Sequence, residues 1–325
     1  MVMSLGSPRN PTLLTLEKIP FDFRKSRPLR REFPGSLTRG NGSRLLMTLI
    51  EVPLDSAPSE WEQLRAALVS IRISDAVSEV EPVPFSGRAP HILRKAESGF
   101  VGLERGNRSK ATILTDGLEL VQSFDVGRWA AGAIAANRHV IITYSEESYY
   151  QGEPIMRAFD RDGSPRDIPQ IRSVNELGKT TGSDVEHVTR ILLDFVGNLW
   201  VFGEMNGQEQ WLVFDVSGRL IPQLKDMADG LAALQVAIWG ESVALMDKEM
   251  REVTLVEPGT FRQRRISILR GQSPSVKELT DSVNVLDSLV FLRYEGPELW
   301  RLRPLEHSST PSPGNSHDLL ATRHS

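Results

Sequence analysis

The sequence predicts an all-β protein built from repeated antiparallel sheets. Two observations carry this prediction. Short runs rich in β-branched and aromatic residues alternate with turn residues along most of the chain, and one turn signature of Asp followed by Gly recurs. The 325 residues are 40% hydrophobic, which is sufficient for a large buried core.

Asp and Gly mark these turns for a physical reason. The carboxylate accepts hydrogen bonds from backbone N–H groups of the turn, and Gly adopts a positive φ without a Cβ clash. The copies lie at residues 116–117, 160–163, 215–218 and, with Glu in place of Asp, 257–259. Their spacing of roughly 40 to 55 residues is typical of the blades of a β-propeller.

The clearest unit extends from Asp184 to Leu224. It contains four β-rich runs, at residues 187–193, 199–204, 210–215 and 219–224, with turn residues between them. This layout predicts a four-stranded antiparallel blade with its apolar first strand near the axis and its more polar fourth strand outside. Trp200, in a nearly continuous apolar run, is predicted to be a core residue.

The remaining units predict a closed ring of six blades in one domain, residues 13–307. The last unit, residues 279–303, offers only three strands, whereas Leu13–Ile19 is a strand left over before the first full unit. We therefore expect Leu13–Ile19 to pair with the strand around Leu299–Arg303 and to remove an open edge. Residues 1–12 and 308–325 are expected to be disordered.

One helix is predicted inside the first unit, over Pro58–Leu68. Ser59 and Glu62 have the spacing of a capping box, and Trp61, Leu64 and Leu68 follow at helical intervals. The alternative is a strand that begins early, because residues 66–73 are compatible with β-structure.

Two motifs in the clearest unit carry a resemblance to a known group of proteins. They comprise Asp194, Gly197, Asn198, Leu199, Trp200 and Val201, and then Phe214, Asp215, Gly218, Arg219 and Leu220. These motifs resemble the repeats of six-bladed bacterial β-propellers of the NHL and TolB-like type, and Pro84–Pro90 is similar to their interblade linker. The resemblance implies the fold, but its members include both enzymes and binding modules, and no family catalytic set matches this sequence.

Composition excludes several classes of function. The net charge is −4 and the pI about 6.0, so we expect no nucleic-acid partner. The chain has no Cys, which excludes disulfides, Cys-based zinc sites and thiolate nucleophiles. No apolar run reaches the ~20 residues of a membrane span. No secretory signal is visible, and an extracytoplasmic location stays open if the start is misassigned.

The candidate binding site lies on one face of the predicted ring. We define the linker face as the face formed by the linkers between blades and by the loops that join the second and third strands of each blade. Exposed loops between regular blades are where specificity is expected. The candidate binding residues are Tyr149, Tyr150, His187, Arg128, Trp129 and Arg172. An alternative is that the loops at residues 145–154 and 169–186 are merely tolerated insertions.

Other polar residues have structural interpretations that compete with functional ones. Gly87–Arg88 and Gly127–Arg128 recur 40 residues apart and could clamp an anion, although tying one blade to the next is the favoured role. His91 and His139 are expected to be structural. Residues 160–163 resemble the start of a calcium loop, but a hairpin turn is favoured because Gly follows the second Asp at once.

The function predicted from the sequence is a non-catalytic binding or scaffold module without a cofactor, expected to be monomeric. Its ligand would be a small molecule or a protein. The alternative is a calcium-dependent propeller hydrolase or lactonase, which needs several carboxylate or Asn ligands at the axis. The candidates for that set are Asp184, Glu186, Asp281 and Asn284.

Overall fold

The structure is a computed structural model of the whole chain. The residues that it describes are 13–20, 31–42, 44–52, 65–73, 78–106, 108–128, 130–136, 139–144, 154–177, 185–205, 208–221, 235–247, 249–269, 279–285, 288–293 and 298–305. Outside this part of the chain lie the predicted binding residues Trp129, Tyr149 and Tyr150 and the segments 1–12 and 308–325.

Four antiparallel sheets follow one another along the chain. The first contains β2 (Arg31–Arg39), β3 (Arg44–Val52), β4 (Arg65–Arg72) and β5 (Glu79–Val83). The second contains β6 (Ile92–Lys95), β7 (Phe100–Glu104), β8 (Ser109–Leu114) and β9 (Leu120–Gly127). The third contains β10 (Ala130–Ala136), β11 (His139–Tyr144), β12 (Met156–Asp160) and β13 (Pro165–Arg166). The fourth contains β14 (Val185–Leu193), β15 (Leu199–Met205) and β16 (Gln208–Phe214).

A fifth sheet has eight strands and joins both ends of the chain. Its order is β17 (Gln235–Trp239), β18 (Ser242–Met246), β19 (Glu252–Val256), β20 (Gln263–Leu269), β1 (Leu13–Ile19), β23 (Glu298–Pro304), β22 (Ser288–Arg293) and β21 (Leu279–Val285). β1 pairs antiparallel with β23 from Leu14↔Pro304 to Ile19↔Leu299, which confirms the predicted pairing. It also pairs in parallel with β20, from Leu13↔Ser267 to Thr15↔Leu269.

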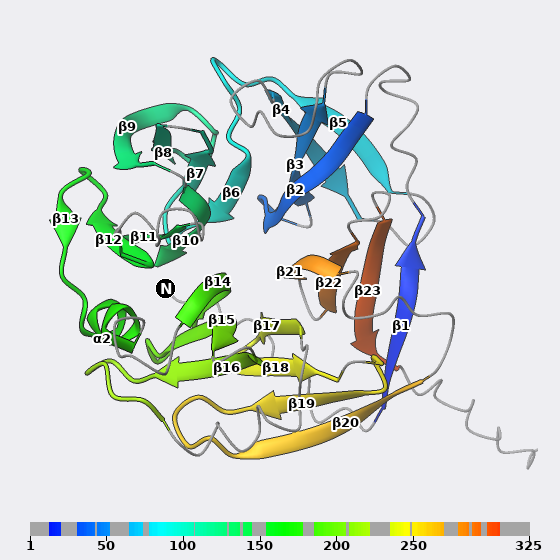
Figure 1. Cartoon of the computed structure of the whole chain (residues 1–325). Coiled ribbons are helices and arrows are strands. Elements are labelled where there is room, and N and C mark those ends of the chain that lie inside the picture. The colour runs from blue at the N-terminus through cyan, green and yellow to red at the C-terminus, as the bar shows by residue number, and fades with distance from the viewer. Residues whose placement is uncertain are drawn as a thin grey trace, which may run out of the picture.

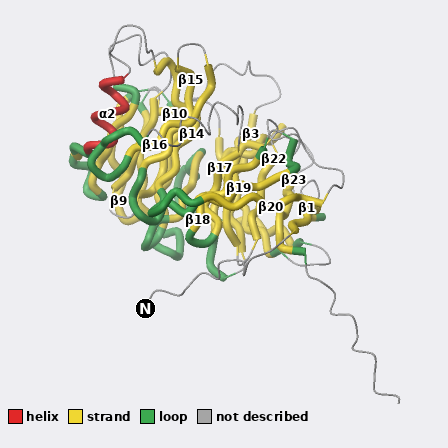
Figure 2. Tube along the Cα trace, turned by 90° about the horizontal axis from the view of Figure 1, so that it is seen from below, coloured by secondary structure: helices red, strands yellow, loops and turns green. Residues whose placement is uncertain are grey.

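The sheets surround a common axis. Figure 1 shows β2, β6, β10, β14, β17 and β21 facing the centre, while β9, β13 and β20 lie at the perimeter. In the perpendicular view of Figure 2, strands of all sheets cross the thickness of the ring. Four of the inner strands carry a β-bulge, at Pro34/Ser36, Ala130/Gly132, Val185/His187 with Val188/Arg190, and Leu279/Asp281. Bulges bend the strand and redirect side chains, so they adapt these strands to the crowded axis.

The hydrophobic core lies between neighbouring sheets. One cluster joins the sheet β14–β16 to β17–β19 through Trp200, Trp211, Val213, Val243 and Val256. Trp200 is only 1% exposed, which confirms its prediction as a core residue. This interleaved packing explains why most strands are apolar on both faces.

A helix takes the place of an outer strand in the third sheet. β13 has only two residues, and α2 (Pro169–Leu177) follows it and packs on β12. Asn175 imitates a strand partner, because its Oδ1 accepts from Met156 N at 3.0 Å and its Nδ2 donates to Met156 O at 2.9 Å. In the described part of the chain, no helix is long and apolar enough to cross a membrane.

Two sequence predictions differ from the structure at the level of secondary structure. Residues 65–68, the end of the predicted helix, belong to β4, while residues 58–64 lie outside the described residues. The β-branched and apolar residues of β4 pair with β3, and tertiary pairing outweighs the local helical spacing. The predicted fourth strand of the sheet β14–β16 is reduced, within the described residues, to a single bridge between Phe214 and Leu220.

Candidate functional site

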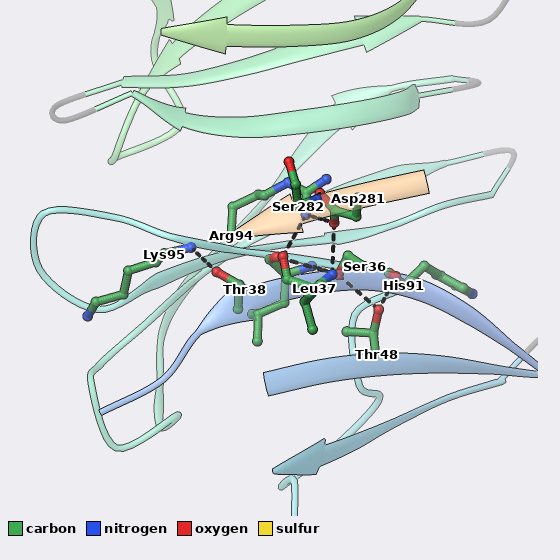
Figure 3. Close-up of polar contacts among 10 residues, drawn as sticks. Ser36, Leu37, Thr38, Thr48, His91, Arg94, Lys95, Asp281 and Ser282 are labelled. Carbon is green, nitrogen blue, oxygen red and sulfur yellow. Dashed lines mark hydrogen bonds and ion pairs between the residues drawn. The ribbon is translucent and has the colours of Figure 1, made fainter. Parts of the chain in front are cut away.

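A polar cluster bonds three inner strands at the axis. The Oδ2 atom of Asp281 on β21 accepts from Arg94 Nη1 on β6 at 2.6 Å and from Leu37 N on β2 at 2.8 Å. The Oδ1 atom accepts from Ser282 N at 2.9 Å. Figure 3 shows these groups converging from three strands far apart in sequence. The ion pair is largely buried, with side-chain exposures of 27% for Arg94 and 16% for Asp281.

Hydroxyl groups extend this cluster between β2 and β6. Ser36 Oγ accepts from Leu93 N at 2.9 Å and shares a hydrogen bond with Thr48 Oγ1 at 2.9 Å, and Thr48 donates to His91 O at 2.7 Å. The close approach requires Gly35, where an added Cβ would lie 2.5 Å from His91 O. These contacts replace a continuous sheet between β2 and β6 (Figure 3).

A second arginine also reaches β21. Arg190 on β14 donates from Nη2 to Leu279 O at 2.9 Å. β21 therefore receives side-chain bonds from both directions around the ring. The contacts hold inner strands together at the axis.

The candidate calcium ligands are placed unfavourably for that role. Asp281 is already bonded to a guanidinium and two backbone N–H groups, which neutralise and occupy its oxygens. Asn284 Oδ1 is buried and accepts no hydrogen bond from the described residues. Asp184 and the side chain of Glu186 are outside the described atoms. Among described residues, no group of three or more His, Asp or Glu is arranged to hold a metal ion.

The described histidines have structural partners. His91 is fully buried, and its Nδ1 accepts from Arg105 N at 3.0 Å, which places the proton of the neutral ring on Nε2. His139 Nδ1 lies 2.8 Å from Asp160 Oδ1. The backbone of His187 pairs with Glu204 at the start of β14, and its side chain is outside the described atoms.

The turn at Asp194 explains the motif that carries the family resemblance. Asp194 Oδ1 accepts from the backbone N atoms of Val196, Gly197 and Asn198 at 3.0, 3.0 and 2.9 Å. Its Oδ2 accepts from Asn198 Nδ2 and Trp200 Nε1, each at 2.9 Å. Gly197 has a φ of +96°. The motif is therefore a folding element of a turn whose Asp194 and Asn198 side chains are buried.

The turn at Asp160 is a hairpin, as predicted. Gly163 N donates to Asp160 O at 3.0 Å, and Ser164 N donates to Asp162 Oδ1 at 2.9 Å. The bond to Ser164 lowers the pKa of the Asp162 carboxyl. The carboxylate of Asp162 therefore serves the turn between β12 and β13, whereas the carboxylate of Asp160 pairs with His139 and Arg166.

Basic groups gather at the linker-face end of the second sheet. Gly87 and Gly127 both have a positive φ, +109° and +100°, and each precedes an exposed arginine, Arg88 and Arg128. Burial raises the pKa of the nearby Glu104 carboxyl, and the charges of Arg88 and Lys110 oppose this shift. Burial also lowers the pKa of Arg105.

Two of the predicted binding residues, Arg128 and Arg172, have described side chains. Arg128 lies on the linker face, directly after β9. Arg172 is exposed on α2 and paired with Asp167. Its neighbour Gln170 bonds to Gly197 O, beyond the C-terminal end of β14, whereas Asn175, further along α2, bonds to Met156 at the first residue of β12. The grouping of Arg172 with the other linker-face residues stays a prediction, because Trp129, Tyr149 and Tyr150 lie outside the described residues.

The sequence analysis missed the residues whose side chains bond the inner strands to one another at the axis. Arg94, Ser36 and Thr48 were not singled out, and Asp281 was considered only as a metal ligand. Arg94 and Asp281 are 187 positions apart, so no local pattern marks the pair. Arg105 and Arg108 were also missed, although their spacing around Gly106 in a turn was visible.

The radial arrangement of antiparallel sheets, each with an inner strand at the axis, is that of a β-propeller. No family model matches the chain, and no curated protein matches its sequence. The chain is similar in structure to a Trichoderma reesei protein of the carbohydrate-active enzyme family AA12, solved as its calcium structure. The identity is 8%, the alignment covers 94% of this chain and 99% of that one, and the TM-score is 0.51.

Two further solved structures are similar over most of their length. The WD40 β-propeller domain of Doa1 is 9% identical, with 93% of this chain and 98% of that one covered and a TM-score of 0.46. YCF48 bound to D1 peptide is 12% identical, with 93% and 99% covered and a TM-score of 0.46. At such identities, structural likeness concerns the fold alone.

Proposed function

We propose that this chain is a six-bladed propeller of the NHL and TolB-like type that acts as a non-catalytic binding or scaffold module. The blade count follows from dividing the eight-stranded sheet at the parallel β1·β20 pair. Each half is then a four-stranded antiparallel unit, and β1 completes the last blade. The proposed domain is residues 13–307, with flanking segments 1–12 and 308–325 outside it.

The observation that carries the binding role is the contrast between the axis and the linker face. At the axis, Arg94, Asp281 and Arg190 are bonded to groups of neighbouring blades. At the linker face, Arg88, Arg108 and Arg128 are exposed. Where the polar groups at the axis bond to neighbouring blades, the loops are the part of the scaffold that can bind a partner. The proposed partner is a protein or a small molecule, and the proposed state is a monomer.

The proposed function is tested by separating binding from stability. The double variant Tyr149→Ala/Tyr150→Ala changes the linker-face loop, and Arg219→Ala changes a side chain that is 85% exposed at the opposite end of the sheets. A partner first recovered with the parent chain is purified, and its affinity is measured for each variant. We expect weaker binding and an unchanged melting temperature for the tyrosine variant alone. Lower stability with unchanged binding would assign these tyrosines to the scaffold.

The calcium-dependent hydrolase or lactonase is the competing function. A metal that binds only the folded state raises the melting temperature by mass action. Because Asp281 is occupied by Arg94, we expect calcium at millimolar concentration to leave the melting temperature unchanged. A calcium-dependent rise that Asn284→Ala removes would favour the enzyme.

A further inference from the structure

The outer strands of the sheets differ in how their edges are protected. An edge strand presents unpaired backbone N–H and C=O groups, so proteins cover it, shorten it or place Pro and charges on it. β20 pairs with β1 at its C-terminal end and carries Arg264 and Arg265 before that. β13 has only two residues, and α2 follows it. β5 carries Pro82, which has no N–H, together with Glu79 and Glu81.

The outer strand β9 has none of these protections. It is eight residues long and contains no Pro, and its only charged side chain is that of Asp125. It is the last strand of the sheet β6–β9, and Figure 1 shows it at the perimeter, on the outer side of β8. In the described part of the chain no further strand pairs with it. Apart from Val126 O, which accepts from Tyr144 Oη, its outer backbone groups can therefore bond to an added strand.

A β-bulge exposes two consecutive apolar side chains at the start of this edge. Beside the pair Leu114↔Leu120, β9 contains one extra residue, Val121, so that two residues of β9 stand opposite one of β8. Leu120 is 56% exposed and Val121 is 61% exposed. From Gln122 to Asp125 the pairing with β8 is regular. The edge therefore offers a regular stretch of backbone next to an exposed apolar pair.

The regular stretch of β9 is fixed against the neighbouring sheet. Gln122 Nε2 donates to Asp162 O, in the turn between β12 and β13, at 2.7 Å. The ring of Phe124 lies 5.8 Å from the ring of Phe159 on β12, centroid to centroid. An edge that is already ordered loses little conformational entropy when another strand binds to it.

The charge next to the apolar pair favours a basic partner. Glu119, directly before Leu120, is exposed and forms no ion pair with another described residue. A basic side chain of an added strand can therefore pair with its carboxylate. A second copy of this chain fits less well. Two β9 strands paired antiparallel about the regular stretch would place Val121 against Val126, which is buried and whose O is already bonded to Tyr144.

We propose that β9 binds an extended segment of a partner protein as a fifth strand of its sheet, with an apolar side chain of that segment on Leu120 and Val121 and a basic one beside Glu119. In strand addition, backbone hydrogen bonds provide affinity, and the side chains at alternate positions select the sequence. The apolar pair lies at the start of β9, whereas the linker face lies beyond its end at Gly127. This surface is therefore additional to the proposed binding function.

The experiment uses a fluorescent eight-residue peptide of alternating Lys and Val. The control peptide has the same sequence with a methyl group on each backbone nitrogen, which keeps the side chains and removes the N–H donors. Binding to the full chain is measured by anisotropy at about 50 and 200 mM salt. We expect the methylated peptide to bind at least tenfold more weakly, because strand addition depends on backbone hydrogen bonds.

Variants of the chain locate the binding surface. Val121→Lys places on the edge the residue with which proteins commonly protect it, and should weaken binding at least fivefold. The matched control is Val216→Lys, because Val216 is 59% exposed in the turn after β16. It should change the affinity less than twofold. Glu119→Gln should weaken binding more at the lower salt concentration. Melting temperatures should stay those of the parent, because all three side chains are exposed.

Four outcomes would overturn the inference. They are no binding of the unmethylated peptide, equal binding of the two peptides, equal loss of affinity in the two Lys variants, and a dimer of the parent chain that Val121→Lys dissociates. The last outcome would assign the edge to a second copy. The tyrosine variant of the linker face should bind the peptide like the parent. Failure of this inference and failure of the linker-face function are therefore separate results.

Discussion

Asp194, in the turn between β14 and β15, and Asp281, on the inner strand β21, both have largely buried carboxylates. They stabilise the protein differently, one through local and the other through long-range hydrogen bonds. All five hydrogen bonds to the carboxylate of Asp194 come from residues within six positions of it. The carboxylate of Asp281 instead bonds to Arg94, 187 positions away, and to Leu37, 244 positions away. The first forms one turn of one sheet, and the second holds different sheets together. Local contacts thus build the sheets, and long-range contacts close the ring.

Removing β1 should have the largest effect, because it eliminates the longest-range contacts. Deletion of residues 1–20 exposes the edges of β20 and β23 and takes Leu14, Leu16 and Ile19 out of the core. We expect aggregation or loss of a cooperative melting transition, measured by light scattering and calorimetry. Deletion of residues 1–12 alone is the control. A protein lacking residues 1–20 that melts like the parent would show that closure does not need β1.

Substitutions of Trp200 test the local contacts around Asp194. Trp200→Ala empties a site packed by two sheets, and we expect a loss of about 3–5 kcal/mol in the free energy of unfolding. Trp200→Phe retains much of the volume but removes the indole N–H bonded to Asp194, and should cost less than the Ala change. Chemical denaturation measures both. Equal losses would mean that the bond to Asp194, not the packing, dominates.

A double-mutant cycle sharpens the distinction between the two aspartates. Arg94→Ala and Asp281→Ala should show a coupling energy of about 2 kcal/mol, because each leaves its charged partner largely buried without the other. Arg94→Ala combined with Asp194→Ala should be additive to within about 0.5 kcal/mol. Denaturant unfolding of the single and double variants provides the energies. Additivity of the first pair would deny a direct role for the ion pair.

The smallest expected effect concerns the ion pair between β1 and β23. The hydrogen bond from Lys18, with a further one from Arg293, lowers the pKa of Glu298 below its ordinary value. Its contribution is therefore present above the unfolded pKa of about 4.3 and is lost as the pH falls through the lower folded pKa. We expect less than ~1 kcal/mol. Melting temperatures from about pH 6 to 3 should fall less in Lys18→Met than in the parent, and identical profiles would contradict the assignment.

Much of the architecture could be predicted from the sequence, because blades are local structures. Leu13–Ile19 was predicted with the bounds that β1 has, and the predicted runs 187–193 and 199–204 differ from β14 and β15 by at most two residues at either end. Hydrophobic patterning and turn chemistry act within a few residues, so they leave a signal in the sequence.

The helix α2 was missed although a signal existed. Pro169 occupies the first helical position, and the buried Ile171 and Val174 are three residues apart. The helix has no acidic residue in its first turn and no basic residue in its last, so the usual charge signals are absent. The regular repeat of β-rich units instead favoured the interpretation of residues 169–186 as a long connection between two blades.

The polar groups at the axis and the arginines of the linker face could be predicted only in part. The repeated Gly87–Arg88 and Gly127–Arg128 were recognised, because repetition is a local signal. The juxtaposition of Arg108 and Arg128 depends on the register of β8 and β9, and the Arg94–Asp281 pair depends on closure of the whole ring. The spacing of these residues along the sequence therefore does not reveal that they lie close together in space.

The pairing of β1 has a consequence for biosynthesis. β1 leaves the ribosome well before its partners β20 and β23. At about 5–20 residues per second, the interval between β1 and β23 is roughly 15 to 60 s. Until β17–β20 have been made, Leu14 and Leu16 have no core to enter and the backbone groups of β1 have no partner strand, and the antiparallel partner β23 comes later still. The nascent chain is therefore expected to need a chaperone on β1 until β20 and β23 have been made.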